Sequence, residues 1–369
     1  MTDDPMTGKN FLEPPSTFHG VLDAMLAREA IDPGLASRLT AVREYLDEED
    51  DTPRPFLTVL LRTQGRRLEP FKDALLCLSA QTDRDFEVIV LEHDAFEEDA
   101  AAVRRIVDRL EPEFGARVRV LEVQGGSRAK PLNVGVLAAT GHYIAVYDDD
   151  DVLFANWVES FRAASHGDHG RLLRAVVATQ TAAPEVWPQN QDGFRTSSWP
   201  KAEYPDHFDL LQHLLVNYSP FMSWAFPRSL FFTYGLRFDE QLTVCEDWDV
   251  ILRGSLICGV DDVPHLTSIY RRWQGGESSY TKHSPEDWRI AEQRVIDRIN
   301  SMAITMPVGS MRIMREMVHY NTALDNYRFM FSGTSLRPPL HHVWNFARPG
   351  FRVAVRARNV LRRLRRRNL

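Results

Sequence analysis

Cysteine is scarce in this sequence, with only Cys77, Cys245 and Cys258 among 369 residues. These three residues are widely spaced, and no two of them form a C-x-x-C pair. The odd number and the spacing argue against a disulfide framework and against a zinc site built from cysteines. This usage is typical of a protein from a reducing compartment.

Long hydrophobic runs are also absent. No uninterrupted apolar stretch approaches the roughly 20 residues that a helix needs to cross a bilayer. Residues 1–15 are acidic and polar, and they lack the apolar run behind a basic stretch that marks a signal peptide. We therefore expect a cytoplasmic protein.

An excess of positive charge is missing as well. The chain has 44 Lys and Arg residues against 51 Asp and Glu residues, a formal net charge of -7. No global basic field is present to hold phosphates, so nucleic acid is not an expected partner. The sequence has no G-x-G-x-x-G motif after its first predicted strand and no G-x-x-x-x-G-K-[ST] motif anywhere. A dinucleotide dehydrogenase and a P-loop NTPase are both disfavoured.

From Pro55 onward the chain alternates strand-like and helix-like segments. Apolar, β-branched runs of strand length occur at 55–63, 86–94, 116–123 and 142–151, and helix-like stretches occur between them at 71–81, 99–115 and 127–141. This alternation implies crossover connections and a mainly parallel sheet with both faces covered. The predicted fold class is α/β.

Four consecutive acids, Asp148 to Asp151, directly follow the apolar strand at 142–147. In open α/β sheets, ligands bind outside the carboxyl ends of the strands. Four carboxylates at that edge repel one another, and a hard divalent cation is the simplest relief. Mg²⁺ or Mn²⁺ binds through one or two carboxylates together with substrate phosphates. The alternative interpretation is an acidic surface turn, which is the usual fate of a charge run.

Two further strand ends carry residues that suit the same kind of ligand. The second strand ends in Glu92-His93-Asp94, and the first ends in Arg62-Thr63-Gln64-Gly65-Arg66-Arg67. The glycine permits a tight turn, and arginines are suited to phosphate oxygens. Together, the three strand ends predict a site for a nucleoside diphosphate.

These residues belong to motifs that resemble the inverting family-two glycosyltransferases of GT-A fold. That family commonly reads V-S-V-I-I-P-T-Y-N-R, E-I-I-V-V-D-D-G-S, A-R-N-x-G, G-E-Y-I-x-x-L-D-x-D, E-D-W/Y-D and Y-R-x-H. The similar segments here follow in the same order over about 220 residues. They are Leu57–Arg66, Glu87–Asp94, Pro131–Gly135, Gly141–Asp150, Glu246–Asp249 and Tyr270–Trp273.

The resemblance implies roles for the nucleotide-binding residues. Glu92 would bind the base of the nucleotide, with Thr63 nearby, and Asp148 and Asp149 would face the ribose and the diphosphate. Asp150 would ligate the metal, Mg²⁺ or Mn²⁺.

The chain departs from the family pattern at three of these positions. Glu92 stands where aspartate is usual, and Leu132 stands where arginine is usual, with Lys130 as the expected replacement charge. Trp273 stands where a metal-binding histidine often occurs.

The resemblance also implies a mechanism, a single displacement that inverts the anomeric carbon. The attacking hydroxyl must lose its proton, which requires a positioned carboxylate, and the leaving diphosphate requires a cation. Asp247 would be the general base, with Glu246 beside it, because both open a predicted helix whose N-terminus favours a carboxylate. The alternative interpretation is that one of them only caps this helix.

The predicted donor is a nucleotide-diphosphate sugar, and the predicted acceptor is a glycan or a lipid-linked glycan. Two other functions remain open from the sequence. A sugar-phosphate nucleotidyltransferase would release pyrophosphate, and an inactive nucleotide-sugar-binding scaffold would show neither hydrolysis nor transfer.

The chain divides into four predicted regions. Helical apolar spacing between Phe18 and Leu46, interrupted at Asp32–Gly34, predicts two short N-terminal helices. The last region is strongly basic and has no acid, and its apolar residues fall on part of a helix opposite much of the arginine. This predicts an interfacial helix on an anionic membrane, at the inner face of the cell membrane. The alternatives are a solvated tail and a basic arm for another acidic partner. The regions are 1–54, a helical extension with an acidic linker; 55–284, a GT-A domain with a nucleotide-sugar half at 55–151 and an acceptor half at 152–284; 285–350, a helical region; and 351–369, the basic tail.

Overall fold

The structure is a computed structural model that describes residues 18–27, 31–47, 52–167, 169–188, 191–275, 283–302, 304, 306 and 310–319. The chain forms two compact units, residues 1–309 and residues 310–369. The second unit is described only over 310–319, which are helical, so the basic tail at 351–369 lies outside the described residues. None of the described helices has both the length and the apolarity needed to cross a membrane.

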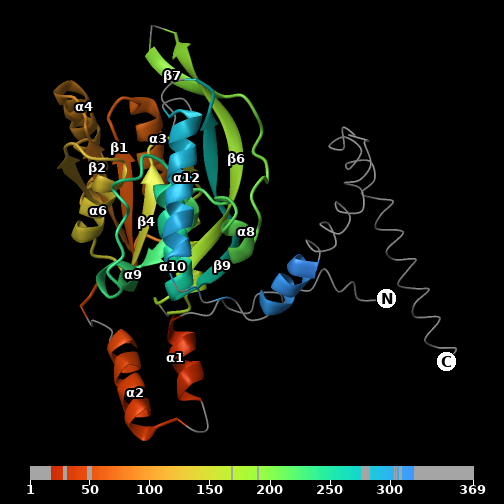
Figure 1. The fold of residues 1–369 in the computed structure, drawn as a ribbon. Coiled ribbons are helices and arrows are strands. Elements are labelled where there is room, and N and C mark those ends of the chain that lie inside the picture. Colours follow the sequence, from red (N-terminus) through yellow and green to blue (C-terminus); the bar gives the residue numbers. More distant parts are fainter. Residues whose placement is uncertain are drawn as a thin grey trace, which may run out of the picture. The chain divides into compact units, whose positions relative to one another are not determined.

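The first unit is built on one mixed sheet, as Figure 1 shows. In the described residues the strand order is β3-β2-β1-β4-β8-β6-β9-β5, with β7 paired to β6 alone. The first four strands are parallel, and β8 joins β4 and β6 in antiparallel pairing. The strands are β1 (Leu57–Thr63), β2 (Phe86–His93), β3 (Val118–Val123), β4 (Tyr143–Asp148), β5 (Val152–Leu153), β6 (Leu172–Trp187), β7 (Gln191–Thr196), β8 (Trp224–Pro227) and β9 (Val260–Trp273).

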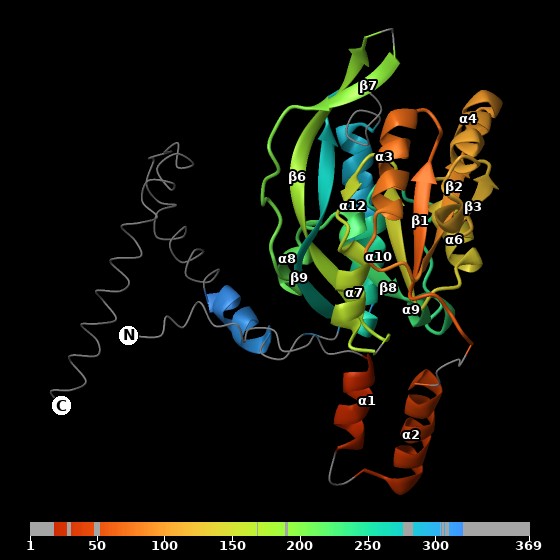
Figure 2. The same cartoon turned by 180° about the vertical axis from the view of Figure 1, so that it is seen from behind.

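Helices cover both faces of this sheet, which explains why the middle of each central strand is apolar, with polar residues mostly at the strand ends. Figure 1 looks onto the face with α6, α10 and α12, and Figure 2 looks onto the face with α3 and α7. The helices are α1 (Phe18–Leu26), α2 (Pro33–Asp47), α3 (Leu68–Ser79), α4 (Glu97–Val107), α5 (Pro112–Gly115), α6 (Ala129–Ala138), α7 (Trp157–Ser165), α8 (Leu210–His213), the 3₁₀ helix η1 (Phe221–Ser223), α9 (Arg228–Phe232), α10 (Glu246–Cys258) and α12 (Pro285–Asn300).

The alternation of side chains along β1 divides the core into two layers. Val59 and Leu61 pack in one cluster with the apolar faces of α3 and α7, whereas Leu60 packs in another with α6 and α10. Gly135 on α6 lies so close to β1 that a Cβ there would be 2.9 Å from Leu60. The close approach of α6 brings the residues before this helix to the carboxyl edge of the sheet.

The predicted α/β class with a mainly parallel first half is confirmed by this topology. The two predicted N-terminal helices are also present, as α1 and α2 on either side of the Asp32 turn. They are joined by an ion pair between Asp23 and Arg43 at 2.9 Å.

The helix α12 packs against the rest of the first unit through one buried face, and Arg294 and Arg298 pair with Asp239. Ala291, Val295 and Ile299 are buried in a cluster with Trp248 of α10. A Ser284–Asp287 capping box, in which each side chain accepts from the other residue's backbone N–H, starts the helix. Residues 285–300 are therefore structurally continuous with the residues of the predicted GT-A domain.

Candidate active site

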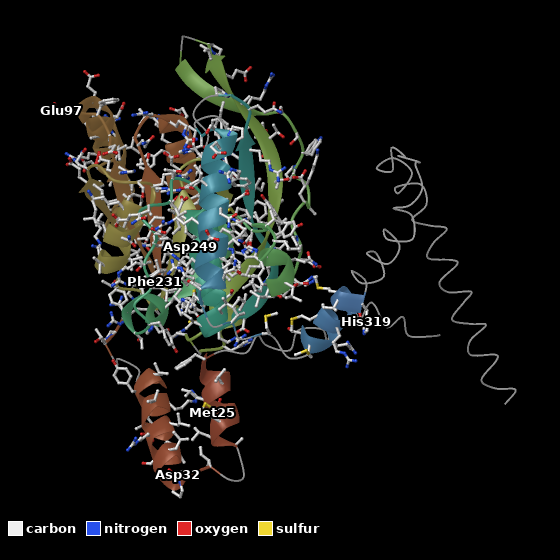
Figure 3. The ribbon with its side chains drawn as sticks, in the orientation of Figure 1. Met25, Asp32, Glu97, Phe231, Asp249 and His319 are labelled. Atoms are coloured by element: carbon white, nitrogen blue, oxygen red, sulfur yellow. The ribbon has the colours of Figure 1, made fainter. Side chains whose placement is uncertain are left out.

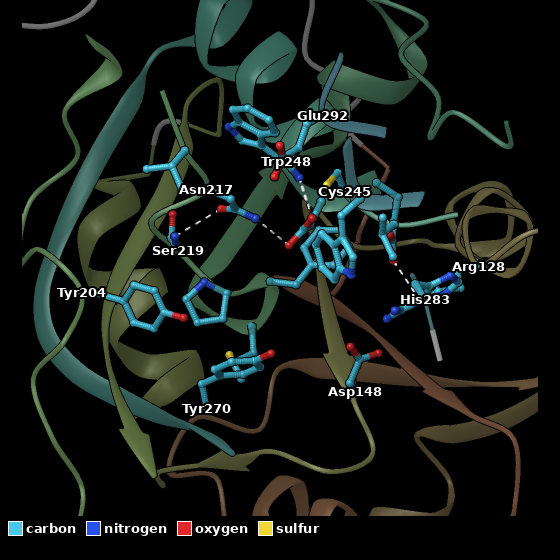
Figure 4. A pocket seen from close by; sticks show the side chains of 18 of the residues that line it. Arg128, Asp148, Tyr204, Asn217, Ser219, Cys245, Trp248, Tyr270, His283 and Glu292 are labelled. Atoms are coloured by element: carbon cyan, nitrogen blue, oxygen red, sulfur yellow. Dashed lines mark hydrogen bonds and ion pairs between the residues drawn. The ribbon is translucent and has the colours of Figure 1, made fainter. Parts of the chain in front are cut away.

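A cavity of about 730 Å³ opens at the carboxyl edge of the parallel strands. Figure 4 shows it between the end of β4, the start of α10 and the loop that precedes η1. It brings together residues far apart in the sequence, including Arg62, Asp148, Asn217, Glu246 and Asp247. Its position is the ligand-binding edge expected of an open α/β sheet.

Arg62 connects the two acidic parts of this cavity. Its Nε and Nη2 atoms donate to the two carboxylate oxygens of Asp148 at 2.8 and 3.0 Å, and its Nη1 atom donates to Glu246 at 3.0 Å. The side chain is only 9% exposed. Asp148 and Glu246 therefore share one buried positive charge, and Arg62 is not available to a phosphate in this arrangement.

A second arginine neutralises the next two acids. Arg67 donates to Asp149 at 2.8 Å and is also hydrogen-bonded to Asp150. Thr63 donates its hydroxyl to the other oxygen of Asp149 at 2.5 Å. The guanidinium of Arg67 lies over the ring of Trp273, at 5.6 Å from the ring centroid. Arg62 and Arg67 thus offset part of the repulsion among these acids, but burial and the charge of Asp150 still raise the pKa of Asp149 to about 6.

The acid cluster provides few ligands for a metal. Among the described residues, no group of three or more His, Cys, Asp or Glu side chains is arranged to hold a metal ion. In the part of the chain that the structure describes, the hydrogen bond found for Asp150 is that of one carboxylate oxygen with Arg67. This arrangement fits a Mg²⁺ or Mn²⁺ ion held by one carboxylate, with the donor diphosphate and water as its other ligands, which is how Mg²⁺ usually binds.

Glu92 lies at the same edge but is completely buried. Its Oε2 atom accepts from Arg104 at 3.4 Å, and its Oε1 atom has no hydrogen-bond partner. Burial raises the pKa of this carboxyl group, against the opposing charge of Arg104. A buried oxygen without a partner is costly, and because Glu92 is fully buried and does not line the cavity, a bound base would reach it only if this edge of the sheet opened.

The structure does not bring Lys130 into the cavity. Its Nζ atom donates to the carbonyl of Gln124 at 2.6 Å, and Leu132 is buried in the core. Arg128 lines the cavity instead, with its Nε atom 3.3 Å from Glu246. Arg128 directly precedes α6 with helical backbone angles and lies one turn before Leu132. The sequence therefore did contain the replacement arginine, but at Arg128, four residues before the Leu132 position where the family pattern has arginine.

The start of α10 places Glu246 and Asp247 in the cavity wall. Cys245, the residue before the helix, has φ of +65°, an uncommon value for a residue other than glycine. Burial tends to raise the pKa of Glu246, but Arg128 and Arg62 outweigh it and lower this pKa. Burial and the charge of Glu246 raise the pKa of Asp247 to about 6. Asp247 is half-buried in the cavity wall, and a carboxylate there that is deprotonated above pH 6 has the properties of a general base.

The other acid of this motif, Asp249, has a structural role. Figure 3 labels it where α10 meets α12. It accepts from Arg253 on its own helix at 3.0 Å and from Arg298 of α12 at 3.0 Å. Arg298 also pairs with Asp239, and so does Arg294. Asp249 is 1% exposed and faces away from the cavity residues of α10, so it is not a second candidate base.

The helix α12 supplies a wall of the cavity that the sequence did not predict. Its face with spacing i, i+3, i+4, i+7 and i+11 lines the cavity, whereas the face with Ala291 is buried in the core. The cavity-lining residues are Pro285, Trp288, Arg289, Glu292 and Ile296. On the opposite side the cavity is lined by Tyr204 and Tyr270 (Figure 4).

Comparisons with known proteins agree with this fold. The chain is similar to a crystal structure of S. aureus TarS residues 1–349 in complex with UDP-GlcNAc, with 17% identity, a TM-score of 0.51 and coverage of 68% of each chain. Its match to another structure of that TarS fragment has a TM-score of 0.48 and covers 66% of it, and its match to longer TarS covers 40% of that chain. No curated protein sequence matches significantly.

Together, the sheet topology and the cavity at its carboxyl edge define a GT-A fold. The family model described as Glycosyl transferase family 2 matches residues 66–230. The resemblance seen in the motifs is thereby confirmed for this segment, which is less than half of the chain. The match contains the Asp148–Asp150 cluster, whereas Asp247 and α12 follow it in the chain.

Proposed function

We propose that the chain transfers a sugar from a nucleotide-diphosphate sugar to a hydroxyl group of a glycan or lipid-linked glycan, with inversion of the anomeric carbon. The observation that supports it is the arrangement of two separate acidic groups around one cavity. Asp148, at the end of β4, and Asp247, at the start of α10, both line this cavity, and Asp148 is on the side proposed for the donor. A single displacement needs these two functions, one for the leaving group and one for the nucleophile.

In this proposal Asp247 removes the proton of the attacking hydroxyl. Its pKa of about 6 leaves it ionised at neutral pH, while burial keeps it more basic than an exposed aspartate. Glu246 is held ionised by Arg62 and Arg128, so its charge favours the protonated form of Asp247 that follows proton transfer. Glu246 therefore assists the base without accepting the proton itself.

The donor occupies the edge formed by β1, β2 and β4. Asp148 faces the ribose and the diphosphate, with Asp149 beside it. Glu92 and Thr63 are buried, so they bind the base end only if this edge opens, and Lys130 lies near the phosphates only if its side chain leaves Gln124. Because the similar TarS structure was determined with UDP-GlcNAc, UDP-GlcNAc is the first donor to test.

The acceptor occupies the half of the cavity between Tyr270 and α12. Tyr204, Tyr270 and Trp288 offer aromatic surfaces there, next to the polar groups of Asn217 and Glu292. Aromatic faces beside hydrogen-bonding side chains suit a sugar ring, which has apolar faces and polar edges.

A divalent cation at Asp150 is part of this proposal and can be tested by calorimetry with UDP. The cation would add a positive charge for the diphosphate and would compete with Arg67 for the Asp150 carboxylate. We expect EDTA to weaken UDP binding by at least about tenfold, and Asp150→Ala to do the same in the presence of Mn²⁺. Asp108→Ala, an exposed aspartate after α4, is the matched control. Equal affinity for UDP in Mn²⁺ and in EDTA would contradict a role for a cation in binding the diphosphate.

We also propose that the basic tail, which lies outside the described residues, attaches the protein to the inner face of a membrane. Each basic residue near an anionic surface contributes about 1 kcal/mol, so eight arginines can hold the protein reversibly. Co-sedimentation with phosphatidylserine vesicles is expected to decrease with salt and to disappear on truncation after Pro349. Equal binding to neutral vesicles, or none to either, would contradict membrane attachment. The arginines are Arg352, Arg356, Arg358, Arg362, Arg363, Arg365, Arg366 and Arg367.

A further inference from the structure

Asn217 is hydrogen-bonded to the proposed base from the opposite side of the cavity. Its Nδ2 atom donates to the Oδ2 atom of Asp247 at 2.8 Å, while its own Oδ1 atom accepts from the backbone N–H of Ser219 at 3.2 Å. Figure 4 shows this chain of two bonds. Since an asparagine amide has one donating and one accepting end, the Ser219 bond determines that the NH₂ group faces Asp247.

The loop that carries Asn217 is itself attached to α10. The indole N–H of Trp248 donates to the carbonyl of His213 at 2.7 Å, and the backbone N–H of Tyr218 donates to the His213 ring at 3.4 Å. Burial lowers the pKa of His213 to about 3, so the ring is neutral and can accept this bond. Asn217 and Asp247 therefore lie on two segments that the hydrogen bond between Trp248 and His213 holds together, and Trp248 directly follows Asp247.

Both oxygens of the Asp247 carboxylate consequently have a fixed donor. The Oδ1 atom accepts from the backbone N–H of Trp248 at 2.7 Å, and the Oδ2 atom accepts from Asn217. Two bonds to different oxygens fix the plane of the carboxylate as well as its position. We propose that Asn217 is a positioning residue, which orients Asp247 so that a lone pair is directed to the acceptor hydroxyl in the cavity. This inference rests on the proposed role of Asp247.

Asn217 donates to Asp247 through a neutral side chain, whereas the other donor to Asp247, the N–H of Trp248, belongs to the backbone. The charged or titratable groups that line the cavity with Asp247 come from every surrounding element. They are Glu246 and Cys245 beside it, Arg128 before α6, Arg62 on β1, Asp148 and Asp151 at the end of β4, Tyr204, Tyr270 on β9, His283 before α12, and Arg289 and Glu292 on α12. The bond from Asn217 favours the ionised carboxylate and therefore lowers its pKa, against burial and the charge of Glu246. Removal of this bond is expected to raise the pKa and to free the carboxylate to rotate.

The test is the pH dependence of UDP-GlcNAc hydrolysis by the full chain, with water as the acceptor. Asn217→Ala is expected to move the midpoint of the acidic limb upward from about 6, by about one pH unit. We expect kcat at pH 7 to fall about tenfold and the KM for UDP-GlcNAc to stay unchanged, because the donor binds elsewhere. Asn217→Asp keeps the shape but adds a carboxylate, so its limb should move further still. Asn156→Ala, which loses an amide bonded to Ser160 on α7, is the control.

A loss of activity that is equal at every pH, with an unshifted limb, would overturn the proposal, because it would indicate a structural defect only. Selective ¹³C labelling of aspartate carboxyl groups gives a second readout that needs no turnover. The signal missing from Asp247→Asn should titrate at higher pH in Asn217→Ala than in the wild type, and an unchanged titration would also overturn the proposal. If the wild type neither binds UDP nor hydrolyses UDP-GlcNAc, the proposed function fails, whereas the NMR titration still decides the role of Asn217.

Discussion

Asp247→Asn is expected to lower turnover by roughly 10²–10⁴-fold, the usual contribution of a general base. The amide keeps the shape of the side chain and can still accept the backbone N–H of Trp248, but it cannot take a proton from the acceptor. The affinity for UDP should stay close to that of the wild type, because Asp247 is separated from the donor acids by Arg62 and Glu246. Single-turnover kinetics and UDP calorimetry separate these two effects.

The pH profile of the wild type gives an independent check on this assignment. Because Asp247 must be ionised to act, activity should increase as the pH rises through about 6, with the inactive protonated form below it.

The control for Asp247→Asn is Asp261→Asn, which changes a partly exposed acid on β9. Asp249→Asn is unsuitable as a control because Asp249 holds α12 through Arg298. Near-normal turnover of Asp247→Asn would move the base to another residue, with Glu246 as the next candidate.

Arg62→Met is expected to destabilise the fold by about 3–5 kcal/mol, the usual cost of leaving a buried charge without its partner. Methionine fills much of the same volume, but Asp148 and Glu246 would then face each other inside the protein without the shared guanidinium. In thermal unfolding this corresponds to a decrease of about 10 °C in the Tm of a domain this large. Arg105→Met, an exposed arginine of α4, is the control.

A second variant identifies the cause of this loss. If the uncompensated carboxylates destabilise Arg62→Met, then adding Asp148→Asn and Glu246→Gln should recover part of the Tm, because the charges that repel each other are gone. An unchanged Tm in Arg62→Met, or no recovery in the triple variant, would show that the Arg62 network contributes little to stability.

The sequence was sufficient to predict the fold because its signals are local. Strands buried on both faces, such as β1 and β4, must be continuously apolar, and the helices between them have enough length for parallel crossovers. The Asp32 turn and the break between α1 and α2 follow from proline and glycine chemistry within three residues. The strand-end acids were found for the same reason, since they directly follow the strand.

The electrostatics of the site could not be predicted, because they depend on contacts between distant segments. Arg62 and Glu246 are 184 positions apart, and the family pattern has proline where Arg62 stands, so nothing local pointed to their pairing. Lys130 was chosen by proximity to Leu132, but the helix geometry of α6 directs its ammonium group to Gln124 and leaves Arg128 in the cavity. The cavity face of α12 has ordinary helical spacing, and only the packing on α10 reveals it.

The central claim is tested most directly by the products formed from UDP-GlcNAc, whose sugar is α-linked to the diphosphate. The purified chain with Mn²⁺ should release UDP, and ¹H NMR of early time points should show the sugar first in the β configuration, before mutarotation. Asp247→Asn should abolish this signal. Release of the α anomer, formation of UTP when pyrophosphate is added, or the absence of UDP from this and every other nucleotide sugar supplied would contradict an inverting glycosyltransferase.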